Sequence, residues 1–98
     1  MKIFISQPMN DKTDDEILSI RKCAIDKCYE KYGNNVTFLN SFFQDISNDH
    51  PHLWWLAKSL ELLSDADLAV FIGDWEKYRG CKIEHMCAKE YNIPIIYL

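Results

Sequence analysis

The spacing of apolar residues changes along the chain and predicts seven elements. Short continuous apolar runs predict buried strands at residues 2–6, 36–39, 68–72 and 93–98. Longer stretches with apolar residues at helical spacing predict helices at residues 14–32, 53–63 and 81–92. Strands and helices alternate from one end to the other. This order predicts an α/β domain built on a parallel sheet.

The first predicted helix has the clearest boundaries. Thr13, followed three residues later by Glu16, forms a capping-box pattern, and Gly33 suits the position just after the last turn. The apolar stripe that should face the core consists of Ile17, Ile20, Ala24, Cys28 and Tyr32. We interpret this helix as structural.

The second predicted helix contains two adjacent tryptophans. Its expected core stripe consists of Leu53, Leu56, Ala57, Leu60 and Leu63. Trp54 and Trp55 would point about 100° apart on a helix, so they do not both face the core. Either one of them caps a pocket or contacts a partner subunit, or one lies in the core and the other is half-exposed.

Right-handed crossovers turn this order of elements into a doubly wound sheet. We expect a small flavodoxin-like or Rossmann-like domain of four parallel strands in the order 2-1-3-4, with about three helices on its two faces. Ligands of such sheets bind beyond the carboxyl ends of the strands where the order reverses, here between the first and third strands. A chain of 98 residues is expected to form one domain, residues 1–98.

Polar residues gather after the third strand. The loop supplies carboxylates, aromatic rings and a guanidinium, from Asp74, Trp75, Glu76, Tyr78 and Arg79. Gly80 allows a tight turn or a close approach of the backbone to a ligand. Glu84 lies about one turn into the third helix, where a carboxylate can act as a nucleophile, a general base or a clamp on a hydroxyl group. The alternative for Glu84 is a solvated acid favoured by the helix dipole.

A second polar group follows the first strand. Ser6 and Gln7 can offer hydrogen bonds to a ligand, although turns contain such residues in any case. This turn has no glycine, so a dinucleotide fingerprint is absent and we predict no cofactor. His50 and His52 flank a proline but lack further ligands at a recognisable spacing, so no metal site is predicted. Asp67 precedes the third strand, which would place it at the edge opposite the ligands.

Composition and charge exclude several classes of partner. The net charge is −4 and there is no basic run, which disfavours nucleic-acid binding. No apolar run approaches 18 residues and no signal peptide is recognisable, so we expect no membrane association. The four cysteines show no CxxC spacing, which favours a reduced, cytoplasmic protein. A small sheet with few residues to cover its edges favours a homo-oligomer, a dimer or larger.

Four segments together resemble the nucleoside 2-deoxyribosyltransferase superfamily, and in particular its short bacterial and phage branch of the DUF4406 type. They are residues 2–6 (KIFIS), 64–71 (SDADLAVF), 80–85 (GCKIEH) and 88–95 (AKEYNIPI). The resemblance covers most of the chain. Its most specific part is the glycine-x-x-x-glutamate segment followed by helix and strand.

The resemblance implies that Glu84 attacks the anomeric carbon of a deoxyribosyl group in a nucleoside or nucleotide. It implies that Asp67 orients or protonates the base, and Asp74 is the nearest candidate for a further family acid, ahead of Glu76. The tyrosine that often follows the first strand in the family is replaced here by Gln7.

Cleavage or transfer of an N-glycosidic bond fits a carboxylate on one face of the sugar and an acid at the leaving base. Trp75 or Tyr78 would stack on the base, and Arg79 would hold a 5′-phosphate. Two alternatives remain open. One is a module that binds a nucleotide without turnover, and the other is an oligomeric interaction protein with Trp54 and Trp55 at the interface.

Overall fold

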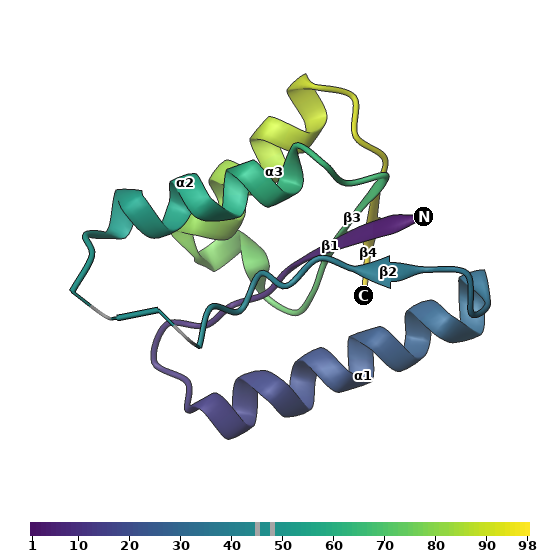
Figure 1. Cartoon of the computed structure of the whole chain (residues 1–98), viewed down its shortest axis with the longest axis horizontal. Helices are drawn as coiled ribbons and strands as arrows, with labels where there is room; N and C mark the ends of the chain where they lie inside the picture. Colours follow the sequence, from purple (N-terminus) through teal and green to yellow (C-terminus); the bar gives the residue numbers. More distant parts are fainter. Residues whose placement is uncertain (45, 48) are drawn as a thin grey trace.

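The protein is described by a computed structural model that covers residues 1–44, 46–47 and 49–98. The elements are β1 (Lys2–Ser6), α1 (Asp14–Tyr32), β2 (Thr37–Phe38), α2 (His52–Leu63), β3 (Leu68–Phe71), the short 3₁₀ helix η1 (Trp75–Lys77), α3 (Arg79–Glu90) and β4 (Ile95–Tyr97). The four strands form one parallel sheet in the order β2-β1-β3-β4 (Figure 1). The predicted fold class and strand order are confirmed.

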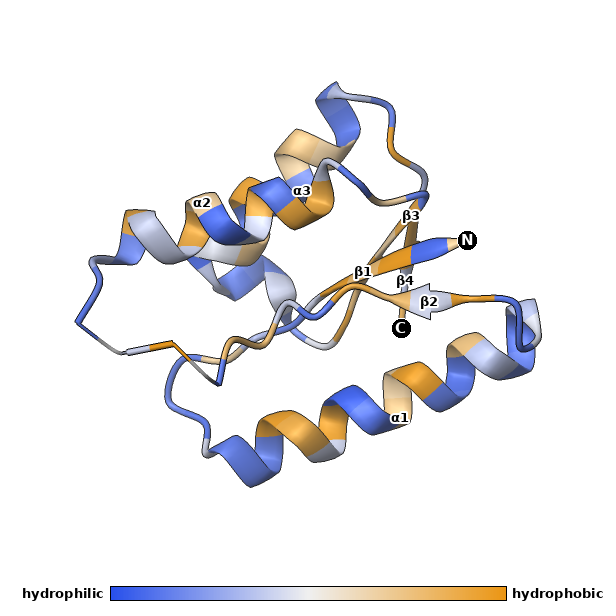
Figure 2. Cartoon of the chain, in the orientation of Figure 1, coloured by the Kyte–Doolittle hydropathy of each residue, from blue (hydrophilic) through white to orange (hydrophobic). Residues whose placement is uncertain are grey.

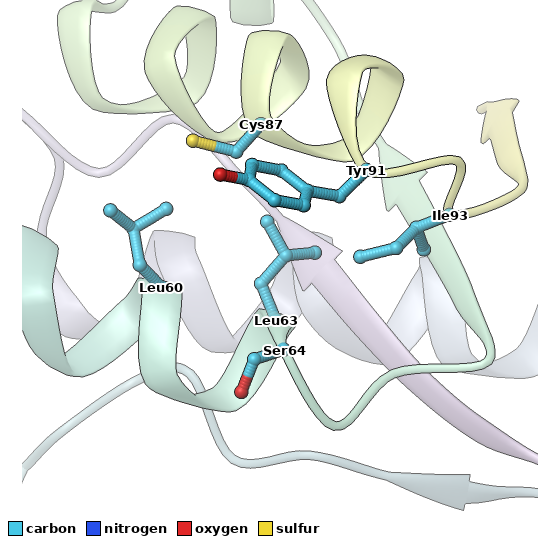
Figure 3. Close-up of a pocket in the computed structure, with 6 residues that line it drawn as sticks. All are labelled: Leu60, Leu63, Ser64, Cys87, Tyr91 and Ile93. Atoms are coloured by element: carbon cyan, nitrogen blue, oxygen red, sulfur yellow. The ribbon is translucent and has the colours of Figure 1, made fainter.

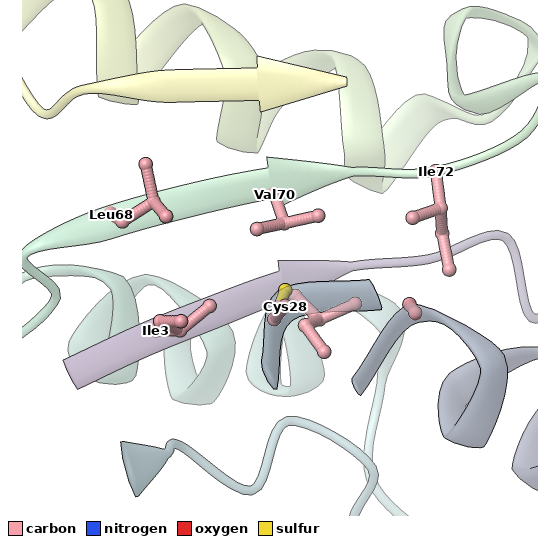
Figure 4. Packing of buried hydrophobic residues seen from close by; sticks show 7 residues of the cluster. Ile3, Cys28, Leu68, Val70 and Ile72 are labelled. Atoms are coloured by element: carbon pink, nitrogen blue, oxygen red, sulfur yellow. The ribbon is translucent and has the colours of Figure 1, made fainter. Parts of the chain in front are cut away.

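Helices cover both faces of the sheet, with α1 on one face and α2 and α3 on the other (Figure 1). Successive residues of a strand point to opposite faces, and the two hydrophobic clusters follow this alternation. On the α1 side, the buried residues are Ile3, Ile5, Ala24, Cys28, Leu68, Val70 and Ile72 (Figure 4). On the other side, they are Phe4, Leu63, Ala69, Phe71 and Ala88. The sheet is therefore covered by apolar side chains on both faces.

Helix α1 has the predicted bounds because its ends are specified locally. The Thr13 hydroxyl accepts a hydrogen bond from the Glu16 amide at 3.2 Å, and the Glu16 carboxylate accepts one from the Thr13 amide at 2.9 Å. Gly33 follows the last turn with φ of 78°, a conformation that favours glycine, and its N–H donates to the Tyr29 carbonyl. In Figure 2 the hydrophobic residues of α1 recur along the helix between hydrophilic ones.

Two of the predicted core stripes are partly wrong. On α1, Ile20 is 41 % exposed and Arg21 is 7 % exposed, because helical spacing allows either neighbour to follow Ile17. On α2, Leu53 is 76 % exposed and Ala57 is also exposed, whereas Leu63 is buried. The first turns of α2 extend past the end of β1, so residues there have no strand beneath them (Figure 1).

The remaining boundaries lie within two residues of the predictions. Strand β2 is limited to Thr37–Phe38, and β4 to Ile95–Tyr97 at one edge of the sheet. Helix α3 begins at Arg79, two residues earlier than predicted, and ends at Glu90. In the part of the chain that the structure describes, no helix has the length and apolar composition that crossing a membrane requires.

Candidate functional site

The last residue of β1 meets a carboxyl group from α3. Ser6 points to the same face as Phe4, because side chains alternate along a strand, and this face is covered by α2 and α3. The Ser6 hydroxyl donates a hydrogen bond to Glu84 Oε1 at 2.6 Å. Ser6 is 1 % exposed and Glu84 is 7 % exposed. A buried carboxyl group thus lies at the carboxyl end of β1, next to β3, where a ligand site was predicted.

Burial controls the protonation of this group. Loss of solvation raises the pKa of Glu84 to about 7, while interactions with the hydroxyls of Ser6 and Ser59 lower it. Near pH 7 the protonated and ionised forms of Glu84 are therefore both well populated. Such a group can give or take a proton, or attack an electrophilic carbon in its ionised form.

The neighbouring thiol does not share this reactivity. Cys81 precedes Glu84 by one helical turn and is buried. The pKa of Cys81 is raised to about 11, mainly by burial and in part by the negative charges of Glu84 and Asp74, while a hydrogen bond with Ser6 opposes the rise. Because the thiolate is the nucleophilic form, Cys81 is a neutral packing residue at neutral pH.

Ser59 is a residue of this site that the sequence analysis missed. It lies on α2, whereas Ser6 is in β1 and Glu84 in α3, so three elements converge on one carboxyl group. The core stripe predicted for this helix does not contain Ser59. The sequence does contain a signal for this position of Ser59. Ser59 is a polar residue four positions before Leu63, so it lies on the same face of the helix as the core stripe.

The predicted loop residues lie immediately before α3 and in its first turn. Asp74 is exposed, and its charge reaches Cys81. Tyr78 is half-buried at the N-cap of α3, and Arg79 is exposed in the first turn. The sharp turn is made by Gly73, which has φ of 62°. Gly80 lies inside the helix, and a Cβ atom added there would meet no atom within 4 Å.

The Trp75 ring packs toward β4. It stacks on His85 with ring centroids 4.2 Å apart and lies 5.9 Å from the Tyr97 ring. His85 Nε2 and the Tyr97 hydroxyl are 2.7 Å apart, which joins the two rings by a hydrogen bond. One face of the Trp75 ring is therefore already covered by His85. The prediction that Trp75 stacks on a base gains no support from this arrangement.

Asp67 lies at the opposite end of the sheet from Glu84. Ile3 pairs with Leu68 and Ser6 pairs with Phe71, so the residue before β3 is level with the start of β1. The Asp67 carboxylate accepts a hydrogen bond from the Lys2 amide at 2.7 Å, and the Asp67 amide donates to the Lys2 carbonyl at 2.8 Å. The strand between them separates Asp67 from Ser6 by roughly 10 Å or more. The structure does not bring Asp67 to the candidate site. Asp67 instead links the start of β3 to the start of β1.

Gln7 turns to the α1 side of the sheet, away from Glu84. Its side-chain amide donates to the Ile17 carbonyl at 2.7 Å, and its carbonyl oxygen is buried without a hydrogen-bond partner among the described residues. Arg21 lies on the same side and donates to the Ser41 hydroxyl at 3.1 Å and to the Leu39 carbonyl at 2.9 Å. Burial lowers the pKa of Arg21. The hydrogen bonds of Arg21 hold α1 against the segment that follows β2.

A separate apolar pocket of about 400 Å³ lies between α2 and α3 (Figure 3). It is lined by Leu60, Leu63, Ser64, Cys87, Tyr91 and Ile93. Leu63 and Ser64 mark the carboxyl-terminal end of α2, which lies at the amino ends of the strands. The pocket is therefore at the opposite edge of the sheet from Ser6, and none of the described residues that line it carries a carboxylate or an imidazole.

No cluster of three or more histidine, cysteine, aspartate or glutamate side chains is arranged to hold a metal ion within the described ranges. Comparisons of the chain with known protein families, with curated proteins and with solved structures gave no match. Functional inference therefore rests on the geometry around Glu84 and on the resemblance of the four sequence segments.

Proposed function

We propose that the protein cleaves or transfers the N-glycosidic bond of a nucleoside or nucleotide, with the Glu84 carboxylate as the nucleophile. The main support is the buried pair of Ser6 and Glu84 at the carboxyl end of β1, with 2.6 Å between the hydroxyl and the carboxylate. This is where an open α/β sheet binds its ligands. The resemblance of residues 80–85 to the nucleoside 2-deoxyribosyltransferases supports the choice of reaction.

The reaction would proceed in two steps. The ionised Glu84 oxygen forms a bond to the anomeric carbon as the N-glycosidic bond breaks, and the bonding electrons leave with the base. The departing base takes up a proton from an acid or from water. Water or a second base then attacks the anomeric carbon and releases Glu84. The Ser6 hydroxyl would hold the carboxylate in a fixed orientation, and Asp74 is the candidate acid nearest in the loop.

Release of free base from deoxynucleosides and deoxynucleoside monophosphates, followed by chromatography, tests this proposal. We expect release by the wild type, none above background by Glu84→Gln, and normal release by Glu90→Gln, an exposed acid at the end of the same helix. Because burial raises the pKa of Glu84 to about 7 and attack needs the ionised form, the initial rate should rise with pH through that range. Equal release by wild type and Glu84→Gln would refute the assignment.

A binding module without turnover is the second candidate. It is favoured by the loop, where Asp74 is exposed and makes no hydrogen bond to Glu84 among the described residues. Asp74, the candidate acid for protonating the leaving base, is therefore not held against Glu84 by a hydrogen bond. Nucleotides that raise the melting temperature without release of base would identify this function. Neither release nor a thermal shift would favour an oligomeric interaction protein.

A further inference from the structure

Hydrogen bonds hold both peptide groups that flank the Cα atom of Ser6. The Ile5 carbonyl, which belongs to the peptide group between Ile5 and Ser6, accepts a hydrogen bond from the Ser41 hydroxyl at 2.8 Å. The Ser6 carbonyl, in the next peptide group, accepts one from the Ile72 amide at 3.2 Å. Because each peptide group is planar, these two bonds restrain the backbone on either side of the Ser6 Cα atom. They therefore restrain the direction in which the Ser6 side chain leaves the strand.

Ser41 continues the pairing with β1 after β2 has ended. The Leu39 amide donates to the Ile3 carbonyl at 2.9 Å. Parallel strands are joined by evenly spaced bonds, so the next acceptor on β1 is the Ile5 carbonyl and the next donor is residue 41. At this position the bond comes from the Ser41 hydroxyl. A side chain thus completes the pairing at the end of β1, and a substitution can remove this bond without deleting any backbone group.

Arg21 orients the Ser41 hydroxyl. Its guanidinium donates to Ser41 Oγ at 3.1 Å and to the Leu39 carbonyl at 2.9 Å. A hydroxyl can accept one hydrogen bond while it donates another, so the Ser41 proton is directed at the Ile5 carbonyl. Arg21 is 7 % exposed and Ser41 is 6 % exposed, so water competes little for either group.

We propose that Ser41, held by Arg21, is a positioning residue for Glu84. Ser41 acts through the peptide group between Ile5 and Ser6, which directs the Ser6 hydroxyl at the Glu84 carboxylate 2.6 Å away. This inference rests on the proposed function, in which Glu84 is the nucleophile. It assigns to that reaction two residues that act on the carboxylate through β1.

Loss of the Ser41 hydroxyl should change the protonation of Glu84. The polar groups around its carboxyl group are the hydroxyls of Ser6 in β1 and Ser59 in α2 and the neutral Cys81 thiol on α3. The hydrogen bond from Ser6 lowers the pKa of Glu84, so a misdirected Ser6 hydroxyl should let this pKa rise. Ser41 carries no charge, so its removal changes no charge interaction with Glu84.

Titration of Glu84 followed by NMR tests the inference without any substrate. The side-chain carboxyl carbons of glutamate are labelled with ¹³C, Glu84→Gln identifies the Glu84 signal, and circular dichroism melting checks that each variant folds. We expect Ser41→Ala to raise the midpoint of this titration by about 0.5 pH unit or more, and Ser6→Ala to raise it further. Ser41→Thr, which keeps a hydroxyl, should retain the wild-type midpoint. So should Ser19→Ala, the same change at an exposed position of α1.

A double variant separates positioning from a general loosening of the structure. Ser6→Ala removes the hydroxyl through which Ser41 acts, so adding Ser41→Ala to it should leave the midpoint unchanged. Arg21→Lys keeps a positive charge but loses the forked donor, and it should raise the midpoint as Ser41→Ala does. An unchanged midpoint in Ser41→Ala overturns the inference. A rise in the double variant equal to the sum of the two single rises overturns it as well.

Ser41→Cys provides a second variant in case Ser41→Ala is unfolded at the temperature of the titration. Its S–H group is a weaker donor of similar size, so the midpoint should rise in the same direction. An unchanged midpoint in Ser41→Cys would then overturn the inference.

The pH dependence of base release separates this inference from the proposed function. A rise of about 0.5 pH unit in the midpoint lowers the ionised fraction of Glu84 by about threefold under acidic conditions, so release by Ser41→Ala should be slower there by that factor. A raised midpoint without base release by the wild type supports the positioning of Glu84 by Ser41 and refutes only the proposed function. Base release with the same pH dependence in wild type and Ser41→Ala overturns the inference and leaves the proposed function standing.

Discussion

Glu84 shows how one buried carboxyl group is kept near its titration point. Transfer from water to the space between α3 and β1 favours the neutral acid, and the hydroxyls of Ser6 and Ser59 favour the ionised form. Burial is the larger effect, so the pKa of Glu84 rises to about 7. A structural acid would be more stable on the surface. The position of Glu84 therefore favours a chemical role over the alternative of a solvated helix acid, which its 7 % exposure contradicts.

This pKa predicts how stability depends on pH. The folded-state pKa of Glu84 lies above the unfolded value near 4.5, so the folded state holds the proton more tightly. The resulting stabilisation is fully present below pH 4.5 and is lost as pH rises through about 7. In urea unfolding, the free energy of unfolding of the wild type should fall by on the order of 1–3 kcal/mol between pH 5 and pH 8 because of Glu84, and this fall should be absent in Glu84→Gln. Glu90→Gln should keep the wild-type dependence, and an unchanged pH dependence in Glu84→Gln would contradict the assigned pKa.

At the scale of elements, three elements each place one polar group at the carboxyl edge of the sheet. Helix α3 places Glu84 there, α2 places Ser59, and β1 ends in Ser6. On the other face, Arg21 of α1 reaches the Leu39 carbonyl and the Ser41 hydroxyl. Because Ser41 in turn donates to the Ile5 carbonyl, the segment after β2 is fixed beside the end of β1.

The substitution Arg21→Met tests whether the hydrogen bonds of Arg21 to Leu39 and Ser41 stabilise the fold. The substitution keeps an apolar stem but leaves the buried Ser41 hydroxyl and the part-buried Leu39 carbonyl without their donor. We expect the free energy of unfolding to fall by on the order of 1–3 kcal/mol, measured by urea denaturation. The matched control is Lys27→Met, an exposed position on the same helix, which should change stability by no more than about 0.5 kcal/mol. Equal effects of the two substitutions on the free energy of unfolding would show that the hydrogen bonds of Arg21 do not stabilise the fold.

Local signals in the sequence were sufficient for the elements and insufficient for the contacts between them. The bounds of α1 could be predicted because Thr13, Glu16 and Gly33 mark its ends within the chain itself. Arg21 could not be distinguished from Ile20, since a buried guanidinium depends on acceptors that come from a distant segment. Ser59 was missed for the same reason, because its interaction with Glu84 follows from the packing of α2 on α3.

At the scale of the whole molecule, the common direction of the parallel strands separates two regions at opposite edges of the sheet. Asp67 and the apolar pocket lie toward the amino ends of the strands, and Ser6 and Glu84 lie toward the carboxyl ends. The short span of β3 is what carries the chain from one region to the other. Glu84 and Asp67, the two residues to which the resemblance assigns roles, therefore lie toward opposite ends of β1 and β3.

Covalent trapping tests the central claim most directly. A 2-fluoro sugar nucleoside slows both steps, because fluorine destabilises an oxocarbenium-like transition state, and the glycosyl-enzyme accumulates after attack. Mass spectrometry of the quenched and digested protein should find the sugar adduct on the peptide that contains Glu84 and none in Glu84→Gln. An adduct on another carboxylate such as Asp74, or no adduct with any nucleoside or nucleotide tested, would contradict the assignment of Glu84 as the nucleophile.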